Sequence, residues 1–122
     1  MALPMTPNTT CDIYRSTHSP PAAPDVAGVK CFLRASNRHS INTLYHTHVL
    51  YVDVTVDIRD GYATVVPTQN VGTANDTVFI PDKNSATTFS VAEVRRVGRG
   101  TPLDHKRVYL LRQKVTYPSN DL

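Results

Sequence analysis

TTFSVAEVRRV, residues 87–97, is the stretch that decides the fold of this chain, together with VYLL at residues 108–111. Both segments are rich in β-branched and aromatic residues, and their apolar side chains recur at intervals of two, which is typical of β-strands. The sequence GRGTPLD at residues 98–104 contains two glycines, a proline and an aspartate, which together indicate a loop. The sequence therefore predicts a β-hairpin with a fairly long loop.

The apolar side chains of the first strand change parity within the strand. Phe89 and Val91 occupy odd positions, whereas Val94 occupies an even one. Since successive side chains of a regular strand point to opposite faces, one extra residue must be accommodated between them. We expect a β-bulge near Ala92 and Glu93.

Four further strands are expected from the same kind of pattern. They lie at residues 11–15, 29–34, 48–59 and 77–80. The third of these shows the clearest alternation, with an apolar residue at every even position from 50 to 58. A strand of that length is unusual, so we expect a bend near Asp53.

The remaining connections are less regular. Residues 16–28 contain three prolines and are expected to form a semi-rigid loop. Residues 35–45 are ambiguous, because three apolar residues there have the spacing of one or two helical turns. Residues 62–66 fit a strand or a loop with anchoring side chains, and residues 67–76 are polar and indicate an exposed loop.

These elements amount to six or seven short strands and at most one short helix, without alternation of strands and helices. Such a pattern predicts an all-β fold, a small antiparallel β-barrel or sandwich with long loops. The 122 residues suit one domain. Residues 1–10 are expected to be an N-terminal arm, residues 11–116 the β-domain, and residues 117–122 a polar tail.

Charge is unevenly distributed along a chain whose net charge is only +3. Residues 93–114 contain seven Lys and Arg against two acidic residues, whereas residues 53–82 contain five Asp against Arg59 alone. Two such blocks can supply complementary faces for a head-to-tail assembly. They can equally be solvated strand faces and loops that pair within one subunit.

The charged residues of these two blocks are the candidate contact residues for a subunit or partner interface. They are Arg95, Arg96, Arg99, Lys106, Arg107, Arg112, Asp53, Asp57 and Asp60. The basic members would either form forked contacts with carboxylates of a neighbouring subunit or contact nucleic-acid phosphates. Tyr109 is the only aromatic residue inside the basic segment, which argues against a stacking platform for single-stranded nucleic acid.

The sequence has no catalytic motif of the hydrolase, zinc-protease, P-loop or dinucleotide-binding kinds. We therefore expect no enzymatic activity, no cofactor and no small-molecule substrate. His46 and His48 should share one strand face, but two imidazoles without a third ligand are weak evidence for a metal site, and we expect none. Cys11 and Cys31 are expected to be buried free thiols, with their pairing left open.

Membrane association is not expected either. The N-terminus lacks a basic segment followed by an apolar one, so we expect no signal peptide. No apolar run approaches the ~20 residues that a membrane-spanning helix needs.

The order of these strands and several short motifs resemble the head–tail joining proteins of tailed bacteriophages, called head-closure or stopper proteins. The matching segments are Asp12-Ile13-Tyr14-Arg15, Val29–Arg34, Thr47-His48-Val49-Leu50-Tyr51, Asp57-Ile58-Arg59-Asp60-Gly61, Thr77–Pro81, Phe89–Val97 and Val108–Leu110. The resemblance is one of layout and short motifs, and it extends over most of the chain.

The resemblance implies a small β-barrel with an extended loop, several copies of which form a homo-oligomeric ring in the virion neck. The ring would lie between the portal or adaptor protein and the tail proteins, after synthesis in the host cytoplasm. It would have no active site and would help to retain the packaged DNA, which it approaches without specific contacts. A loop at residues 65–76 or the segment 35–45 would point into the channel, and residues 1–10 and 16–28 would contact neighbours. The residues implied for the channel loop are Thr68, Gln69, Asn70 and Asn75.

Two other functions are compatible with the same sequence. One is a small oligonucleotide-binding barrel, which would use the basic hairpin to bind DNA or RNA. The other is a different phage neck or tail component, such as a tail terminator or an adaptor. An adaptor is expected to be largely helical, so the fold discriminates between them.

Overall fold

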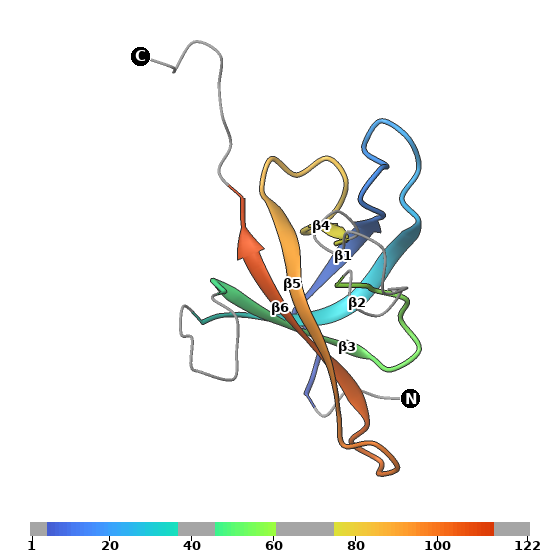
Figure 1. Cartoon of the computed structure of the whole chain (residues 1–122), viewed down its shortest axis with the longest axis vertical. Helices are drawn as coiled ribbons and strands as arrows, with labels where there is room; N and C mark the ends of the chain where they lie inside the picture. The colour runs from blue at the N-terminus through green and yellow to red at the C-terminus, as the bar shows by residue number, and fades with distance from the viewer. Residues whose placement is uncertain (1–4, 37–45, 61–74, 114–122) are drawn as a thin grey trace, which may run out of the picture.

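The structure is a computed structural model that describes residues 5–36, 46–60 and 75–113. These residues form six strands and no helix (Figure 1). The strands are β1 (Thr9–Tyr14), β2 (Val26–Ala35), β3 (His48–Asp53), β4 (Thr77–Phe79), β5 (Thr88–Val97) and β6 (His105–Arg112). No helix in the described ranges could span a membrane.

The six strands close into a barrel in the order β1-β2-β3-β6-β5-β4. Every neighbouring pair is antiparallel, including the β1–β4 pair that completes the circle. The predicted all-β class is confirmed, and the fold is the barrel rather than the sandwich. Closure pairs the strand edges with one another, so few backbone groups are left to recruit other chains.

One apolar cluster fills the inside of the barrel. All six strands contribute to it, because each places alternate side chains inward. Its buried members are Cys11, Ile13, Val29, Cys31, Leu50, Val52, Ile58, Val78, Ile80, Phe89, Val91, Val108 and Leu110. A second, smaller cluster lies on the outward positions of β3 and β6. It consists of Val49, Tyr51 and Tyr109, with Met5 and Phe32 packed against it.

The predicted hairpin is formed by β5 and β6, the pair with the longest register in the barrel. The expected bulge is confirmed, because the register shifts between Val91 and Glu93. In Figure 1 the loop of this hairpin extends beyond the other strands, at the bottom of the view. Gly98 starts the loop at a φ of 75°, and a Cβ atom there would lie 2.9 Å from the carbonyl oxygen of Leu103. Only glycine fits that position without strain.

Several expected boundaries are wrong by a few residues. The arm predicted for residues 1–10 ends earlier, because Thr9 already pairs with Cys31 and the Asn8 side chain exchanges two hydrogen bonds with the Leu33 backbone. The strand predicted for residues 48–59 ends at Asp53, where the bend was expected, and a turn follows. The last strand begins at His105 rather than at residue 108.

Other expectations lie outside the described residues. The possible helical turns fall mainly on residues 37–45, and the segment 62–66 also lies outside. Of the implied channel-loop residues, Thr68, Gln69 and Asn70 lie outside, and only Asn75 is described.

Candidate functional site

The basic residues of the β5–β6 hairpin divide into those that pair with a carboxylate of the described residues and those that do not. Arg95 forms an ion pair with Glu93 at 2.7 Å, and its guanidinium carbon lies 5.5 Å from the Tyr109 ring centroid. The Arg96 side chain donates two hydrogen bonds to Asp104, at 2.9 and 2.5 Å. These contacts raise the pKa of both arginines and lower the pKa of Asp104. Both arginines are therefore held within the subunit.

The other basic candidates are less constrained by carboxylates. Lys106 donates to the Val56 carbonyl at 2.6 Å, and burial lowers its pKa. Arg99 and Arg112 are exposed, and neither forms an ion pair with any residue that the structure describes. Arg107 lies on the outward face of β6, with its guanidinium carbon 5.5 Å from the Tyr51 ring centroid.

The acidic candidates are mostly engaged inside the subunit. Asp57 pairs with Arg15 and Arg59, and the Arg59 hydrogen bond is the main cause of its lowered pKa. Asp60 is buried and accepts a hydrogen bond from the Val94 amide at 2.9 Å. The acidic block thus braces its own barrel, and its ion pairs are with Arg15 and Arg59 rather than with the basic hairpin.

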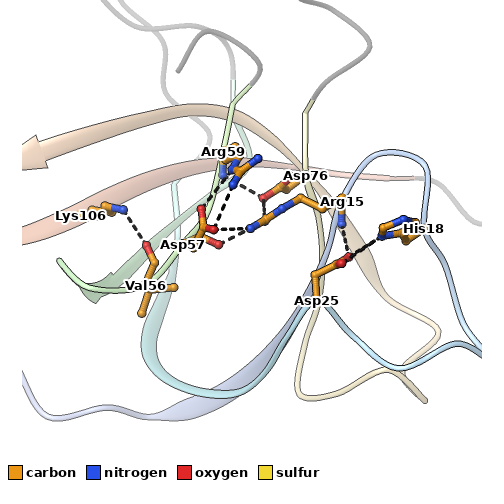
Figure 2. Close-up of polar contacts among 8 residues, drawn as sticks. All are labelled: Arg15, His18, Asp25, Val56, Asp57, Arg59, Asp76 and Lys106. Atoms are coloured by element: carbon orange, nitrogen blue, oxygen red, sulfur yellow. Dashed lines mark hydrogen bonds and ion pairs between the residues drawn. The ribbon is translucent and has the colours of Figure 1, made fainter. Parts of the chain in front are cut away.

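Arg15, at the end of β1, is the centre of this bracing (Figure 2). Its guanidinium contacts the carboxylates of Asp57 and Asp76, each at 2.6 Å. Asp76 is fully buried, and the same carboxylate oxygen also accepts from the Arg59 amide at 2.9 Å. Burial nevertheless raises the pKa of Asp76, because desolvation of the carboxylate outweighs these favourable contacts.

The bulge in β5 receives a second set of polar contacts. The Asn75 amide donates to the Val91 carbonyl at 2.6 Å, Asp60 accepts from the Val94 amide, and Asp60 and Asn75 are bridged to each other. These side chains satisfy backbone groups of β5 at the point where the register shifts. We call Asp60 and Asn75, with their contacts to β5, the bulge clamp. It joins the two chain ends that flank residues 61–74.

A group of cations and aromatic rings occupies the outward face of β2, β3 and β6. The guanidinium carbons of Arg34 and Arg107 lie 5.8 and 5.5 Å from the centroid of the same ring, that of Tyr51. Arg34 Nε also donates to the Tyr51 hydroxyl at 3.1 Å. Phe32 packs edge-on against Tyr51, with ring centroids 6.0 Å apart. We call Arg34, Tyr51 and Arg107 the Tyr51 site.

Beside the Tyr51 site lie three buried polar atoms that have no hydrogen-bond partner among the described residues: Asp53 Oδ1, His105 Nε2 and Arg107 Nε. Asp53 and His105 are cross-strand neighbours, and the His105 ring centroid lies 5.8 Å from that of Tyr51. His105 Nδ1 lies 2.6 Å from the Leu103 carbonyl, to which it must donate. Buried polar atoms are rarely left unsatisfied, so these three atoms mark an incompletely satisfied part of the molecule.

The two histidines expected on one face contact different clusters. The His46 ring packs edge-on against Tyr109 of the outer cluster, whereas the His48 ring packs against Phe89 of the inner one. Within residues 5–36, 46–60 and 75–113, no three His, Cys, Asp or Glu side chains are grouped as a metal site would need.

Cys11 and Cys31 are free and buried, as the sequence predicts. A hydrogen bond with Cys31 and burial raise the pKa of the Cys11 thiol. The thiol form is therefore strongly favoured, and a thiol is a poor nucleophile.

Sequence reasoning found Arg107 but missed Arg34 and Tyr51. Each of the two has a readable signal, an outward position on an alternating strand, yet the sequence does not say that β2, β3 and β6 are neighbours. Along the chain, Tyr109 is the only aromatic residue among the basic ones. In the folded barrel, the Tyr51 ring also lies beside Arg34 and Arg107. Arg15 was also missed, because its partners lie 42 and 61 positions away.

Comparison of the chain with protein-family models, with curated proteins and with solved structures finds no match. What the chain does must therefore be argued from the barrel and its surface.

Proposed function

We propose that this chain is a structural protein of the neck of a tailed bacteriophage, of the head-closure type. Copies of it would form a ring between the portal or adaptor protein and the tail and would help to retain the packaged DNA. The proposal is supported by the likeness in strand layout to head-closure proteins and by a closed antiparallel barrel of the kind that this likeness implies. One fold can serve many functions, so the arrangement of the polar side chains matters as well.

The observation that carries the proposal is the use of the buried carboxylates. Asp12 accepts from the backbone amides of Gly28 and Lys83, each at 2.8 Å, and Asp60 and Asp76 accept from the amides of Val94 and Arg59. Each carboxylate therefore ties a connection to the barrel. A catalytic carboxylate needs a reacting group within hydrogen-bond reach. These three instead accept from backbone amides of their own chain, and Asp76 also pairs with the Arg15 guanidinium. The arrangement suits a rigid building block.

A barrel that binds single-stranded nucleic acid is less well supported. Stacking of bases needs accessible ring faces. Tyr51 and Tyr109 are only 6% and 8% exposed, and arginine side chains lie against both rings. An adaptor is also disfavoured, because it should be largely helical and residues 5–36, 46–60 and 75–113 contain no helix.

The test is a nonsense mutation in the gene that encodes this chain, in the phage that carries it. We expect DNA-filled heads and free tails that do not join, with gradual loss of DNA from the heads, in electron micrographs of the lysate. Antibody against the chain should label wild-type virions at the neck. Normal virions from the mutant, or label confined to the capsid or the tail tip, would exclude the proposal.

A further inference from the structure

We infer that the Tyr51 site is a docking site for a carboxylate-bearing surface of a protein other than this chain itself. The chemistry of the site follows from the arrangement of its side chains. That the partner is a neighbouring virion protein rests on the proposed function.

The Tyr51 site carries positive charge that no neighbouring carboxylate compensates among the described residues. Two guanidinium groups lie around one ring, and neither has a carboxylate partner in the described part of the chain. Arg34 Nε is used on the Tyr51 hydroxyl and Arg107 Nε is buried, which leaves the terminal guanidinium nitrogens of both arginines. Several N–H donors of the two arginines therefore remain available, and two nearby positive charges attract an anion.

The geometry of the guanidinium groups indicates which kind of anion fits the Tyr51 site. The Tyr51 ring and its hydroxyl hold the Arg34 guanidinium in place, and a positioned planar guanidinium matches a carboxylate in a two-bond fork. The neighbouring Phe32, which is partly exposed, adds apolar contact area. Arginine and tyrosine beside apolar side chains are typical of the energetic centres of protein interfaces. A single-stranded nucleic acid fits less well, because the Tyr51 ring is only 6% exposed and cannot stack a base.

A second copy of this chain has few carboxylates that could occupy the Tyr51 site. Every acidic side chain within the described ranges accepts a hydrogen bond from its own chain: Asp12, Asp25, Asp53, Asp57, Asp60, Asp76, Asp82, Glu93 and Asp104. Of the exposed ones, Asp25 also contacts His18 Nδ1 at 2.9 Å and Asp57 is also in an ion pair, which leaves Asp82.

The cations show the opposite pattern. Seven of the Lys and Arg side chains have no carboxylate partner among the residues that are placed: Lys30, Arg34, Lys83, Arg99, Lys106, Arg107 and Arg112. The charge that this surface offers to another molecule is therefore mainly positive. Two copies would present like charges to each other, which disfavours their contact through this face. A chain with a different, acidic surface is the complementary partner.

The test uses the full chain and a fluorescently labelled octaglutamate peptide as the probe, followed by anisotropy at low salt. We expect saturable binding that R34Q/R107Q weakens about tenfold, as two partly exposed ion pairs would. The matched control R99Q/R112Q removes the same charge at exposed positions away from Tyr51, and we expect less than a twofold change. If R34Q/R107Q does not fold, R34K/R107K keeps the charge but loses the fork, and about a threefold weakening is expected.

Absence of binding, or equal weakening in the test and control variants, would overturn the inference. A labelled oligothymidylate is titrated in parallel. Tighter binding of this DNA than of the peptide, lost in the same R34Q/R107Q variant, would assign the Tyr51 site to nucleic acid and also overturn it.

Sedimentation velocity separates the inference from the proposed function. Self-association of the wild-type chain should persist unchanged in R34Q/R107Q, because the site serves another protein. Loss of self-association in that variant would make a second copy the occupant and would overturn the inference. If octaglutamate binds as expected but the antibody does not label the neck, the proposed function fails and the docking chemistry stands.

Discussion

The most informative perturbation of this fold is removal of the Arg15 side-chain charge. Arg15 is the cation that lies against the fully buried carboxylate of Asp76, at 2.6 Å. Removing one partner of a buried pair leaves an uncompensated charge, which typically destabilises a protein by 3–5 kcal/mol. Arg15 is partly exposed, so we take the lower end and expect R15M to lower the free energy of unfolding by about 3 kcal/mol.

The matched control is R59M. The Arg59 side chain pairs with Asp57, and both are substantially exposed, so this pair should contribute at most about 1 kcal/mol. The Arg59 backbone amide that binds Asp76 is unchanged by the substitution. For a domain of this size, about 3 kcal/mol corresponds to a fall in Tm on the order of 10 °C. Urea unfolding followed by circular dichroism measures both variants.

A double variant tests whether the uncompensated buried charge of Asp76 causes the loss of stability in R15M. In R15M/D76N the buried side chain is neutral, so we expect about 1–2 kcal/mol of stability to return relative to R15M. Burial raises the folded pKa of Asp76, and loss of Arg15 raises it further. An acidic group whose folded pKa is raised destabilises the fold as pH rises through that pKa. The stability advantage of R15M/D76N over R15M should therefore shrink as pH falls, because Asp76 of R15M then becomes protonated and loses its charge. Equal losses in R15M and R59M, or a double variant no more stable than R15M, would refute this account of the bracing.

Three further outcomes are expected. G98A should destabilise the chain more than G100A, because both glycines have positive φ but only at Gly98 would a Cβ atom meet a backbone oxygen; thermal melts of the pair decide it. L110A should lower the free energy of unfolding by about 3 kcal/mol, because Leu110 is in the core, and L111A by less than about 0.5 kcal/mol, because Leu111 is partly exposed. Similar losses for the two variants in urea titrations would contradict the assigned inward and outward faces. Cys11 and Cys31 should react with a thiol reagent only when the chain is unfolded, because both are buried; rapid modification of the native chain, measured by mass spectrometry, would be inconsistent with this core.

Local pattern was enough to predict the strands and the class of the fold. The period of two placed Leu50 and Val52 correctly in the core, and the parity change between Val91 and Val94 correctly predicted the bulge. Both signals arise from neighbouring residues, which is why one sequence suffices. The ends of strands were less accurate, because pairing partners rather than propensity decide where a strand stops. Thr9 and His105 are strand residues because Cys31 and Asp53 are opposite them.

The candidate site was only partly predictable, because it depends on which strands become neighbours. Arg107 was visible in a run of charge, but Arg34 and Tyr51 lie 73 and 56 positions before it. A charge count along the chain also cannot distinguish a buried Asp60 from an exposed Asp57. Sequence reasoning treated the carboxylates as surface groups, whereas two of the five in the acidic block are buried supports.

The bulge clamp has a consequence for how this protein can change over evolutionary time. Asp60 and Asn75 are each hydrogen-bonded to β5 and are bridged to each other, so the two residues that flank the intervening segment are fixed to the barrel. Lengthening a connection between fixed points adds only about 0.6 kcal/mol of closure entropy for each doubling. Selection could therefore rewrite or extend the intervening segment to suit a new host or assembly partner while the six strands keep their stability.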